Sequence, residues 1–295
     1  MPARASAKPR VAIVGAGNLA NALAAALRVA NYAIDEIVSR ANAASIKRTR
    51  TLAREVRASA ATIYRAQLRA EIVWFCVPDR EIASAAESLS EAADWKGKVA
   101  LHSSGALTSD ALEILRKRGA AIASVHPLMT FVRGSRPSLK AVPFALEGDA
   151  RAVRVARALI LNLRGEPFTV QKRSKEAYHA WGMFISPLFI ALLAAAERLA
   201  GAAGIRRHEA RERMLPILRQ TLANYERMGA PQSFSGPIAR GDIDTVKRHL
   251  KELDRFPAAR EVYVALARVA LRELPAKDRA EFLKVLGRAA PPRNR

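Results

Sequence analysis

Two apolar, strand-like runs of the sequence end in polar side chains that could take part in chemistry. His102-Ser103-Ser104-Gly105 follows Val99-Ala100-Leu101, and His126 comes directly after Ala121–Val125. Ligands of open α/β sheets bind at the carboxyl ends of the strands, so these side chains are candidates for a binding site. A helix cap or a packed turn would explain each segment taken alone. We predict that Ser104 is catalytic, that Ser103 borders a cofactor and that His126 binds substrate.

Lys175 and His179 form a second candidate pair. They lie four residues apart at the start of an apolar helical stretch, so one face of the helix carries both. Near a helix N-terminus, the helix dipole and desolvation disfavour the charged form of a lysine. Such a lysine could donate a proton to a carbonyl oxygen that receives hydride. A solvated helix start is the alternative interpretation; we predict catalytic roles for Lys175 and His179.

A glycine-rich turn, Gly15-Ala16-Gly17-Asn18-Leu19-Ala20, stands between the apolar run Val11–Val14 and an amphipathic helical pattern. Gly15 would allow the tight turn, Gly17 would let the backbone approach a pyrophosphate, and Ala20 is small enough for close helix–strand packing. The strand before the turn and the helix after it are the context that a dinucleotide fingerprint requires. An ordinary turn between a strand and a helix is the alternative. Gly15, Gly17, Asn18 and Leu19 are therefore predicted to bind the cofactor.

The end of the second strand-like run, Ile34–Ser39, indicates which dinucleotide is bound. NAD sites place an acidic residue there for the ribose 2′-hydroxyl, whereas NADP sites tend to have arginine. Ser39 and Arg40 occupy this position, while Asp35 and Glu36 come too early. Because a guanidinium fork suits a 2′-phosphate, NADP (as NADPH) is the predicted cofactor. The alternative is that Arg40 is an ordinary surface arginine.

The loop Val77-Pro78-Asp79 should border the same cofactor. It follows the apolar run Ile72–Val77, and the carboxyl end of a parallel strand faces the ligand crevice. Val77, Pro78 and Asp79 are therefore predicted cofactor-binding residues. Cys76 precedes this loop, and we interpret it as a small core residue rather than a nucleophile.

Two residues of the second half of the chain are candidate substrate ligands. Arg240, in the polar loop Ser235–Asp242, could form a fork onto a substrate carboxylate, and Asn224 in the preceding helical pattern could reach the same space. Asp242 is a natural N-cap for the next helix. The five histidines and one cysteine of the chain form no metal-ligand spacing, so no metal is expected.

The order of these patterns predicts an α/β fold followed by an all-α fold. Continuous apolar runs that alternate with helical patterns indicate strands buried on both faces of a doubly wound, parallel sheet of the Rossmann type. Further strands are expected at 143–146 and 168–170, and helices at 174–201, 208–229, 242–254, 257–273 and 276–289. We predict a dinucleotide-binding domain over residues 9–172 and a helical substrate and dimerisation domain over 173–290.

Composition limits the class of protein. Half of the 295 residues are hydrophobic, which allows two packed domains, and the single cysteine excludes an internal disulfide framework and fits a reducing cytoplasm. The N-terminal residues lack the apolar stretch of a secretory signal. The longest apolar run, Trp181–Ala196, is shorter than a membrane span, and we expect it to be a buried helix of a soluble protein. The net charge of +22 is spread along the chain, so we expect neither a nucleic-acid nor a membrane partner.

Taken together, the motifs resemble a family. Gly-Ala-Gly-Asn-Leu-Ala, Cys-Val-Pro-Asp, His-Ser-Ser-Gly, His-Pro-Leu, Lys-x-x-Tyr-His and Gly-Pro-Ile-Ala-Arg-Gly-Asp occur here in that order. This set resembles the uncharacterised bacterial proteins that join a Rossmann-like domain to a C-terminal domain of unknown function. Their layout is similar to pyrroline-5-carboxylate reductase, ketopantoate reductase and the β-hydroxyacid dehydrogenases. The resemblance implies a second domain like the C-terminal domain of 6-phosphogluconate dehydrogenase, and a homodimer.

One position departs from this family. Members often carry a Ser-Asn pair in the long helix, whereas this chain reads Ser186-Pro187. The proline removes a possible hydrogen bond to substrate and is expected to kink the helix.

Two functions remain open from the sequence. The first is an NADP-dependent oxidoreductase that acts on a small carbonyl, imine or hydroxy acid at the cleft between the domains. The second is a non-catalytic dinucleotide-binding or sensor protein, because a Rossmann fold does not by itself imply catalysis. Nucleic-acid binding ranks last, because no recognition motif accompanies the charge.

Overall fold

The computed structural model describes residues 8–287 in two compact units, of which the first ends at Phe184 and the second begins at Ile185. The sequence placed the boundary after residue 172. The structure places it later because helix α6 (Lys175–Ile185) buries Lys175 and Tyr178 at its start, and these side chains bond to residues of the sheet. The first turns of α6 therefore belong to the N-terminal unit.

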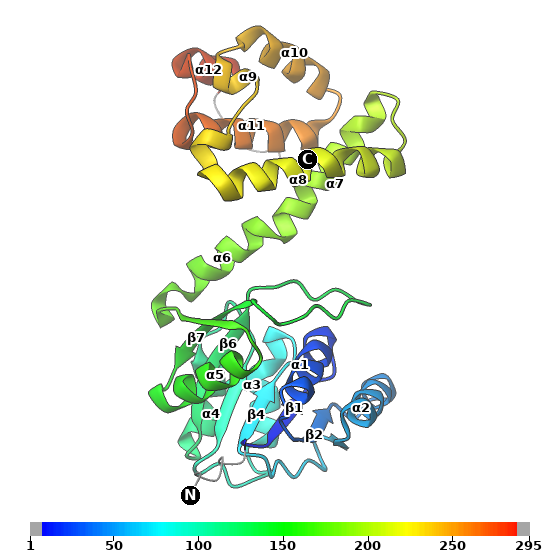
Figure 1. The fold of residues 1–295 in the computed structure, drawn as a ribbon, viewed down its shortest axis with the longest axis vertical. Helices are drawn as coiled ribbons and strands as arrows, with labels where there is room; N and C mark the ends of the chain where they lie inside the picture. The colour runs from blue at the N-terminus through cyan, green and yellow to red at the C-terminus, as the bar shows by residue number, and fades with distance from the viewer. Residues whose placement is uncertain (1–7, 288–295) are drawn as a thin grey trace, which may run out of the picture. The chain divides into compact units, whose positions relative to one another are not determined.

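An eight-stranded sheet forms the centre of the N-terminal unit (Figure 1). Its order, β3-β2-β1-β4-β5-β6-β7-β8, begins with the doubly wound arrangement in which the connection reverses between β1 and β4. This confirms the predicted Rossmann-type sheet. The strands are β1 (Val11–Val14), β2 (Ile34–Ser39), β3 (Ser59–Thr62), β4 (Ile72–Phe75), β5 (Val99–His102), β6 (Ala121–Pro127), β7 (Pro143–Gly148) and β8 (Glu166–Thr169).

Two features of the sheet differ from the sequence prediction. Strand β3 was missed because it is a short edge strand of small residues without an apolar run. Strand β7 pairs antiparallel with β6, and β8 pairs parallel with β7, so the last two strands run opposite to the others. A loop without a helix joins β6 to β7, and an antiparallel return is the pairing that such a connection allows.

Helices cover both faces of this sheet and bury two apolar cores. One core joins strand residues such as Ile13 and Trp74 to Leu23 of α1 and Leu159 of α5. The other core joins the opposite strand positions to α3 and α4. The helical elements of this part are α1 (Asn18–Val29), α2 (Ala43–Val56), α3 (Asp79–Leu89), the 3-10 turn η1 (Ser109–Leu112), α4 (Glu113–Lys117) and α5 (Ala150–Asn162), with the 3-10 turn η2 (Lys172–Ser174) before α6.

The second unit is built from helices throughout its described residues, as the sequence predicts. They are α7 (Pro187–Ala202), α8 (Arg207–Ser233), α9 (Pro237–Arg240), α10 (Ile243–Leu253), α11 (Pro257–Glu273) and α12 (Arg279–Val285). The side chains of Val246, Leu250, Val264 and Phe282 form its small core. Asp242 caps α10 by accepting a hydrogen bond of 3.0 Å from the backbone N–H of Thr245, which confirms the predicted N-cap.

The predicted single helix over 174–201 is two helices. Helix α6 ends at Ile185, Ser186 has non-helical backbone angles, and α7 begins at Pro187, which has no N–H for the preceding helix to use. The expected kink at Pro187 is therefore a complete break.

The prediction that the apolar run Trp181–Ala196 is buried is wrong for the single chain. Trp181 is 49% exposed, Phe184 70% and Ile190 62% in the part of the chain that the structure describes. The stretch Lys172–Ala202, which contains α6 and α7, is also long and apolar enough to cross a membrane by length and composition. This run therefore presents an uncovered apolar surface.

Candidate functional site

The glycine-rich turn lies between β1 and α1, at the carboxyl edge of the sheet. Gly15 has a φ of 116°, and a Cβ at this position would overlap the carbonyl oxygen of Cys76 on the neighbouring segment. A Cβ at Gly17 would meet no atom within 4 Å, so the backbone there faces open space. No side chain caps the first turn of α1, which leaves its N–H groups available to an anion. The turn thus has the properties of a phosphate cradle.

A cavity of about 730 Å³ opens beside this turn. Ligand sites of about 300–1,000 Å³ are typical of small molecules and cofactors. Of the predicted cofactor residues, Gly15, Gly17, Asn18, Ser39, Arg40, Val77 and Pro78 line it, together with Ala16, Asn21, Ser45, Lys47, Arg48, Thr51, Cys76, Glu81 and Arg133.

Three predicted cofactor residues lie outside the lining of this cavity. Leu19 packs against the core under α1. Asp79 begins α3, and its carboxylate accepts a hydrogen bond of 2.6 Å from the Ser104 hydroxyl. The Ser103 hydroxyl accepts a hydrogen bond of 2.8 Å from the Trp74 indole N–H. In the structure these three side chains contact other residues of the protein rather than the cavity.

The cavity carries an excess of positive charge. Four of its lining side chains are basic (Arg40, Lys47, Arg48 and Arg133), and one, Glu81, is acidic. Arg40 and Glu81 form an ion pair of 2.9 Å in which the arginine side chain is 58% exposed and the glutamate 19%. One terminal nitrogen of the guanidinium group is therefore paired with Glu81, while the side chain stays largely exposed to solvent.

Lys175 is the most deeply placed charged residue of the predicted site. Its side chain is 1% exposed, and its ammonium group donates hydrogen bonds to the backbone oxygen of Ser104 (2.9 Å) and to the hydroxyl of Ser124 (2.7 Å). Burial lowers the pKa of Lys175 from 10.5 to about 8, although the carboxylates of Glu147 and Asp79 oppose this shift. An amine with such a pKa exchanges protons near neutral pH.

The structure brings the predicted residues Ser104, His126 and His179 close to this lysine. Nδ1 of His126 shares a hydrogen bond of 2.7 Å with the Tyr178 hydroxyl, and the ring centroids of His126 and His179 lie 6.4 Å apart. A Cβ at Gly105 would collide with both imidazoles, so a glycine is needed for this approach. The two imidazoles and the Ser104 backbone therefore form one cluster with Lys175 at the ends of β5 and β6 and the start of α6.

Burial keeps two histidines of this region neutral. The pKa of His126 falls to about 4 because the ring is desolvated and because Lys175 and His179 are nearby. Desolvation also lowers the pKa of His102 to about 4. Nδ1 of His102 accepts from the backbone N–H of Ser104, so Nε2 carries the proton and donates to the Thr108 carbonyl at 3.0 Å. His102 thus fixes the turn that presents Ser104.

Two other buried groups of the site are held in their neutral form. Burial raises the pKa of Tyr178 to about 12. Burial also raises the pKa of the Cys76 thiol to about 12, which makes it a poor nucleophile and agrees with its interpretation as a core residue.

Sequence reasoning missed Ser124, which accepts the hydrogen bond from Lys175. The signal was a polar residue inside the apolar run of β6, Ala-Ile-Ala-Ser-Val. Tyr178 belongs to the Lys-x-x-Tyr-His pattern one turn after Lys175 on α6, but the pattern alone does not indicate its contact with His126. Lys47, Arg48 and Arg133 were likewise not assigned to the cofactor.

Arg240 and Asn224 lie in the second unit. Arg240 is the last residue of α9, and Asn224 accepts a hydrogen bond of 2.8 Å from Gln220 on α8. Their assignment to substrate stays a prediction.

Solved structures with the same fold include three informative examples. A putative NADP oxidoreductase from Bacteroides fragilis has 21% identity and a TM-score of 0.74, covering 89% of this chain and 97% of its own. A protein from Thermotoga maritima has 27% identity and a TM-score of 0.69, covering 88% and 96%. An imine reductase from Myxococcus stipitatus, solved in complex with NADP+, has 18% identity and a TM-score of 0.63, covering 91% and 96%. No curated protein sequence matches the chain.

Two family models match consecutive parts of the sequence. A model described as a Rossmann-like domain matches residues 3–127, and the domain of unknown function DUF2520 matches residues 142–270. This agrees with the resemblance that the motifs indicated. The chain therefore has a region that matches the Rossmann-like domain, followed by a region that matches DUF2520.

Proposed function

We propose that the protein is an NADP-dependent oxidoreductase that acts on a small carbonyl, imine or hydroxy acid. The observation that carries this proposal is the basic cavity beside the glycine turn, within which Gly17 faces open space and Arg40 stands at the end of β2. Folds shared with an imine reductase crystallised with NADP+ and with a pyrroline-5-carboxylate reductase from Coxiella burnetii support it.

The cofactor fits the residues that are present. The uncapped first turn of α1 would hold the pyrophosphate, and Arg40 with Ser39 would bind the 2′-phosphate. Bound there, the nicotinamide supplies or accepts the hydride, and the protein provides orientation and electrostatics.

The chain's own contribution to catalysis would come from the cluster at the carboxyl edge. Lys175 uses two of its three ammonium protons for Ser104 and Ser124, which leaves one for the oxygen or nitrogen of a substrate. We assign it the role of proton donor or stabiliser of that atom. Ser104 and His179 would assist it, and His126 would orient the substrate.

We further propose a homodimer in the cytoplasm. The exposed apolar side chains of α6 and α7 would be buried in the dimer. In a two-fold symmetric dimer, each subunit presents the same surface to the other.

Arg40 offers the sharpest test of the cofactor proposal. Arg40→Ala should weaken NADPH binding about ten- to hundredfold, because a charge-assisted contact of about 1.5–3 kcal/mol is lost, while NADH binding should change little. Titration of intrinsic Trp fluorescence measures both affinities. Arg65→Ala, at an exposed arginine that does not line the cavity, is the control. Equal losses for both dinucleotides would contradict the 2′-phosphate assignment.

A non-catalytic dinucleotide sensor is the second candidate. The observation that favours it is the burial of Lys175, whose side chain is 1% exposed and bonded to the sheet. Tight NADPH binding without turnover of any keto, imino or hydroxy acid in a broad panel would support the sensor and exclude the enzyme for those substrates.

A further inference from the structure

The connection between β6 and β7, residues 128–142, is unusual for its length and position. Antiparallel neighbours are ordinarily joined by about 2–5 residues, and much longer connections without secondary structure are usually functional. This β6–β7 loop leaves the sheet at the carboxyl end of β6, the edge that carries the glycine turn, and it extends over α1 in Figure 1.

Two side-chain contacts fix the β6–β7 loop to the dinucleotide-binding elements. The amide of Asn18, the first residue of α1, donates a hydrogen bond of 3.0 Å to the backbone oxygen of Phe131. Arg136 forms a two-pronged ion pair with Glu55 near the end of α2, at 2.9 and 3.2 Å. The loop is thus attached both to the phosphate turn and to the helix that follows β2.

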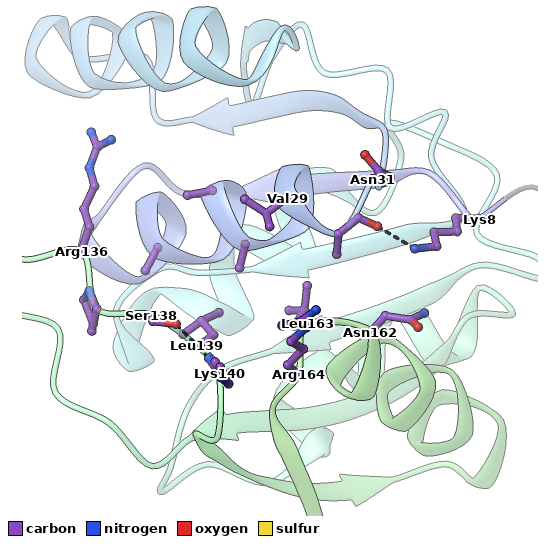
Figure 2. A pocket seen from close by; sticks show the side chains of 15 residues that line it. Lys8, Val29, Asn31, Arg136, Ser138, Leu139, Lys140, Asn162, Leu163 and Arg164 are labelled. Carbon is purple, nitrogen blue, oxygen red and sulfur yellow. Dashed lines mark hydrogen bonds between the residues drawn. The ribbon is translucent and has the colours of Figure 1, made fainter.

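The second half of the β6–β7 loop packs along α1. Leu139 is 2% exposed and belongs to the core beneath that helix. Figure 2 shows Arg136, Ser138 and Lys140 on this half of the loop, beside a second cavity whose other wall includes Val29 of α1. The loop is therefore packed at Leu139, and its two attachments, at Phe131 and Arg136, lie on either side of Arg133.

Arg133 is the residue that these attachments present to the cofactor cavity. It lines the same cavity as Gly15, Gly17 and Asn18, more than a hundred residues earlier in the sequence. No carboxylate of residues 8–287 lies within 4.0 Å of its guanidinium group, whereas Arg40 of the same cavity is paired with Glu81. A guanidinium without a carboxylate partner, in a cavity that the uncapped first turn of α1 also lines, favours a phosphate ligand.

We propose that Arg133 binds the pyrophosphate of the dinucleotide and that the β6–β7 loop is a strap across the bound cofactor. This inference rests on the proposed function but concerns a different part of the cofactor from Arg40. The pyrophosphate is common to NADPH and NADH, whereas only NADPH has the 2′-phosphate. Attachment to Asn18 places the strap at the phosphate turn, so Arg133 stabilises both dinucleotides alike.

Fluorescence titrations with NADPH and NADH test the proposal. Arg133→Ala should weaken both dinucleotides by a similar factor of about ten to a hundred, as expected for the loss of a charge-assisted contact, and Arg133→Lys should recover part of the affinity. Lys140→Ala, which removes a positive charge from the same loop outside the cofactor cavity, should leave both affinities within twofold of the wild type. Unchanged affinity in Arg133→Ala, or a loss confined to NADPH, would overturn the inference.

Limited trypsin digestion provides a second readout that needs no turnover. Trypsin cuts after arginine, and Arg133 is exposed in the protein without dinucleotide, so saturating NADPH or NADH should slow cleavage at this bond several-fold. Cleavage after Arg133 that is indifferent to bound dinucleotide would count against the strap. If wild-type protein bound neither dinucleotide, the proposed function would fail with the inference; wild-type binding with an unaffected Arg133→Ala variant would overturn the inference alone.

Discussion

Lys175 gives the most informative prediction, because the structure shows both its hydrogen-bond partners and the burial that lowers its pKa. The lysine is buried, bonded to Ser104 and Ser124, and has a pKa of about 8. If the ammonium form donates the proton during reduction, kcat/KM for the NADPH-dependent reaction should be level below this pKa. Above it the protonated fraction falls about tenfold for each pH unit, so activity at pH 9 should be about a tenth of the plateau.

Substitution by Lys175→Met keeps the length and apolar stem of the side chain but removes the charge. General acid catalysis contributes about 10²–10⁴-fold to rate, so turnover should fall by a factor in that range and the decline above pH 8 should disappear. Dinucleotide binding should persist, because Lys175 does not line the cofactor cavity. Steady-state rates from pH 6 to 10, with binding measured alongside, provide the data.

A matched control comes from the same segment. Lys172→Met removes a half-exposed lysine of η2 whose partner is Asp110, and it should leave both the rate and the pH profile unchanged. Turnover of Lys175→Met within twofold of the wild type, or an unchanged pH profile, would refute the proton-donor role. A circular dichroism spectrum equal to that of the wild type shows that the variant is folded.

Three further predictions concern stability and assembly. Ser124→Ala leaves a buried ammonium N–H of Lys175 without its acceptor, so the free energy of unfolding in urea should fall by about 1–3 kcal/mol. The pKa of Lys175 should fall too, which moves the pH profile of kcat/KM to lower pH. An unchanged pH profile would show that Ser124 does not affect the pKa of Lys175. His102 and His126 have pKa values lowered from 6.5 to about 4, so the unfolded chain binds more protons than the folded one between these values and the melting temperature should fall as the pH drops from 6.5 to 4. His102→Asn should lessen that loss and His249→Asn should not; the same acid sensitivity in both variants would contradict this assignment. Sedimentation velocity of the wild type should give twice the 32.1 kDa chain mass. The double variant Phe184→Ser with Ile190→Ser should be a monomer, whereas the control Val29→Ser on α1 should remain a dimer. A wild-type monomer at all concentrations would exclude the dimer.

Local patterns were enough to predict most of the N-terminal unit. The bounds of β1 follow from a short continuous apolar run. The turn between β1 and α1 follows from two glycines: Gly15 has no room for a Cβ, and Gly17 leaves the backbone facing open space. Helices α8, α10, α11 and α12 of the second unit likewise follow from their periodicity, whereas α9 lies in a segment that was expected to be a loop. Edge strand β3 and the reversal at β7 were not predictable, because pairing partners and strand direction depend on neighbours distant in sequence.

The sequence by itself determined the central parallel strands and the glycine turn, and it indicated Lys175 as a candidate, because each depends on residue types within one strand, turn or helix. Only the tertiary structure decided what surrounds them. It joined Lys175 to Ser124 across 51 positions, and it placed Arg133 in the cavity of Gly15 and Gly17. It also left the apolar side chains of α6 and α7 exposed on the single chain. Hydrogen bonds and burial of this kind arise between segments that meet only when the chain packs, so no local pattern encodes them.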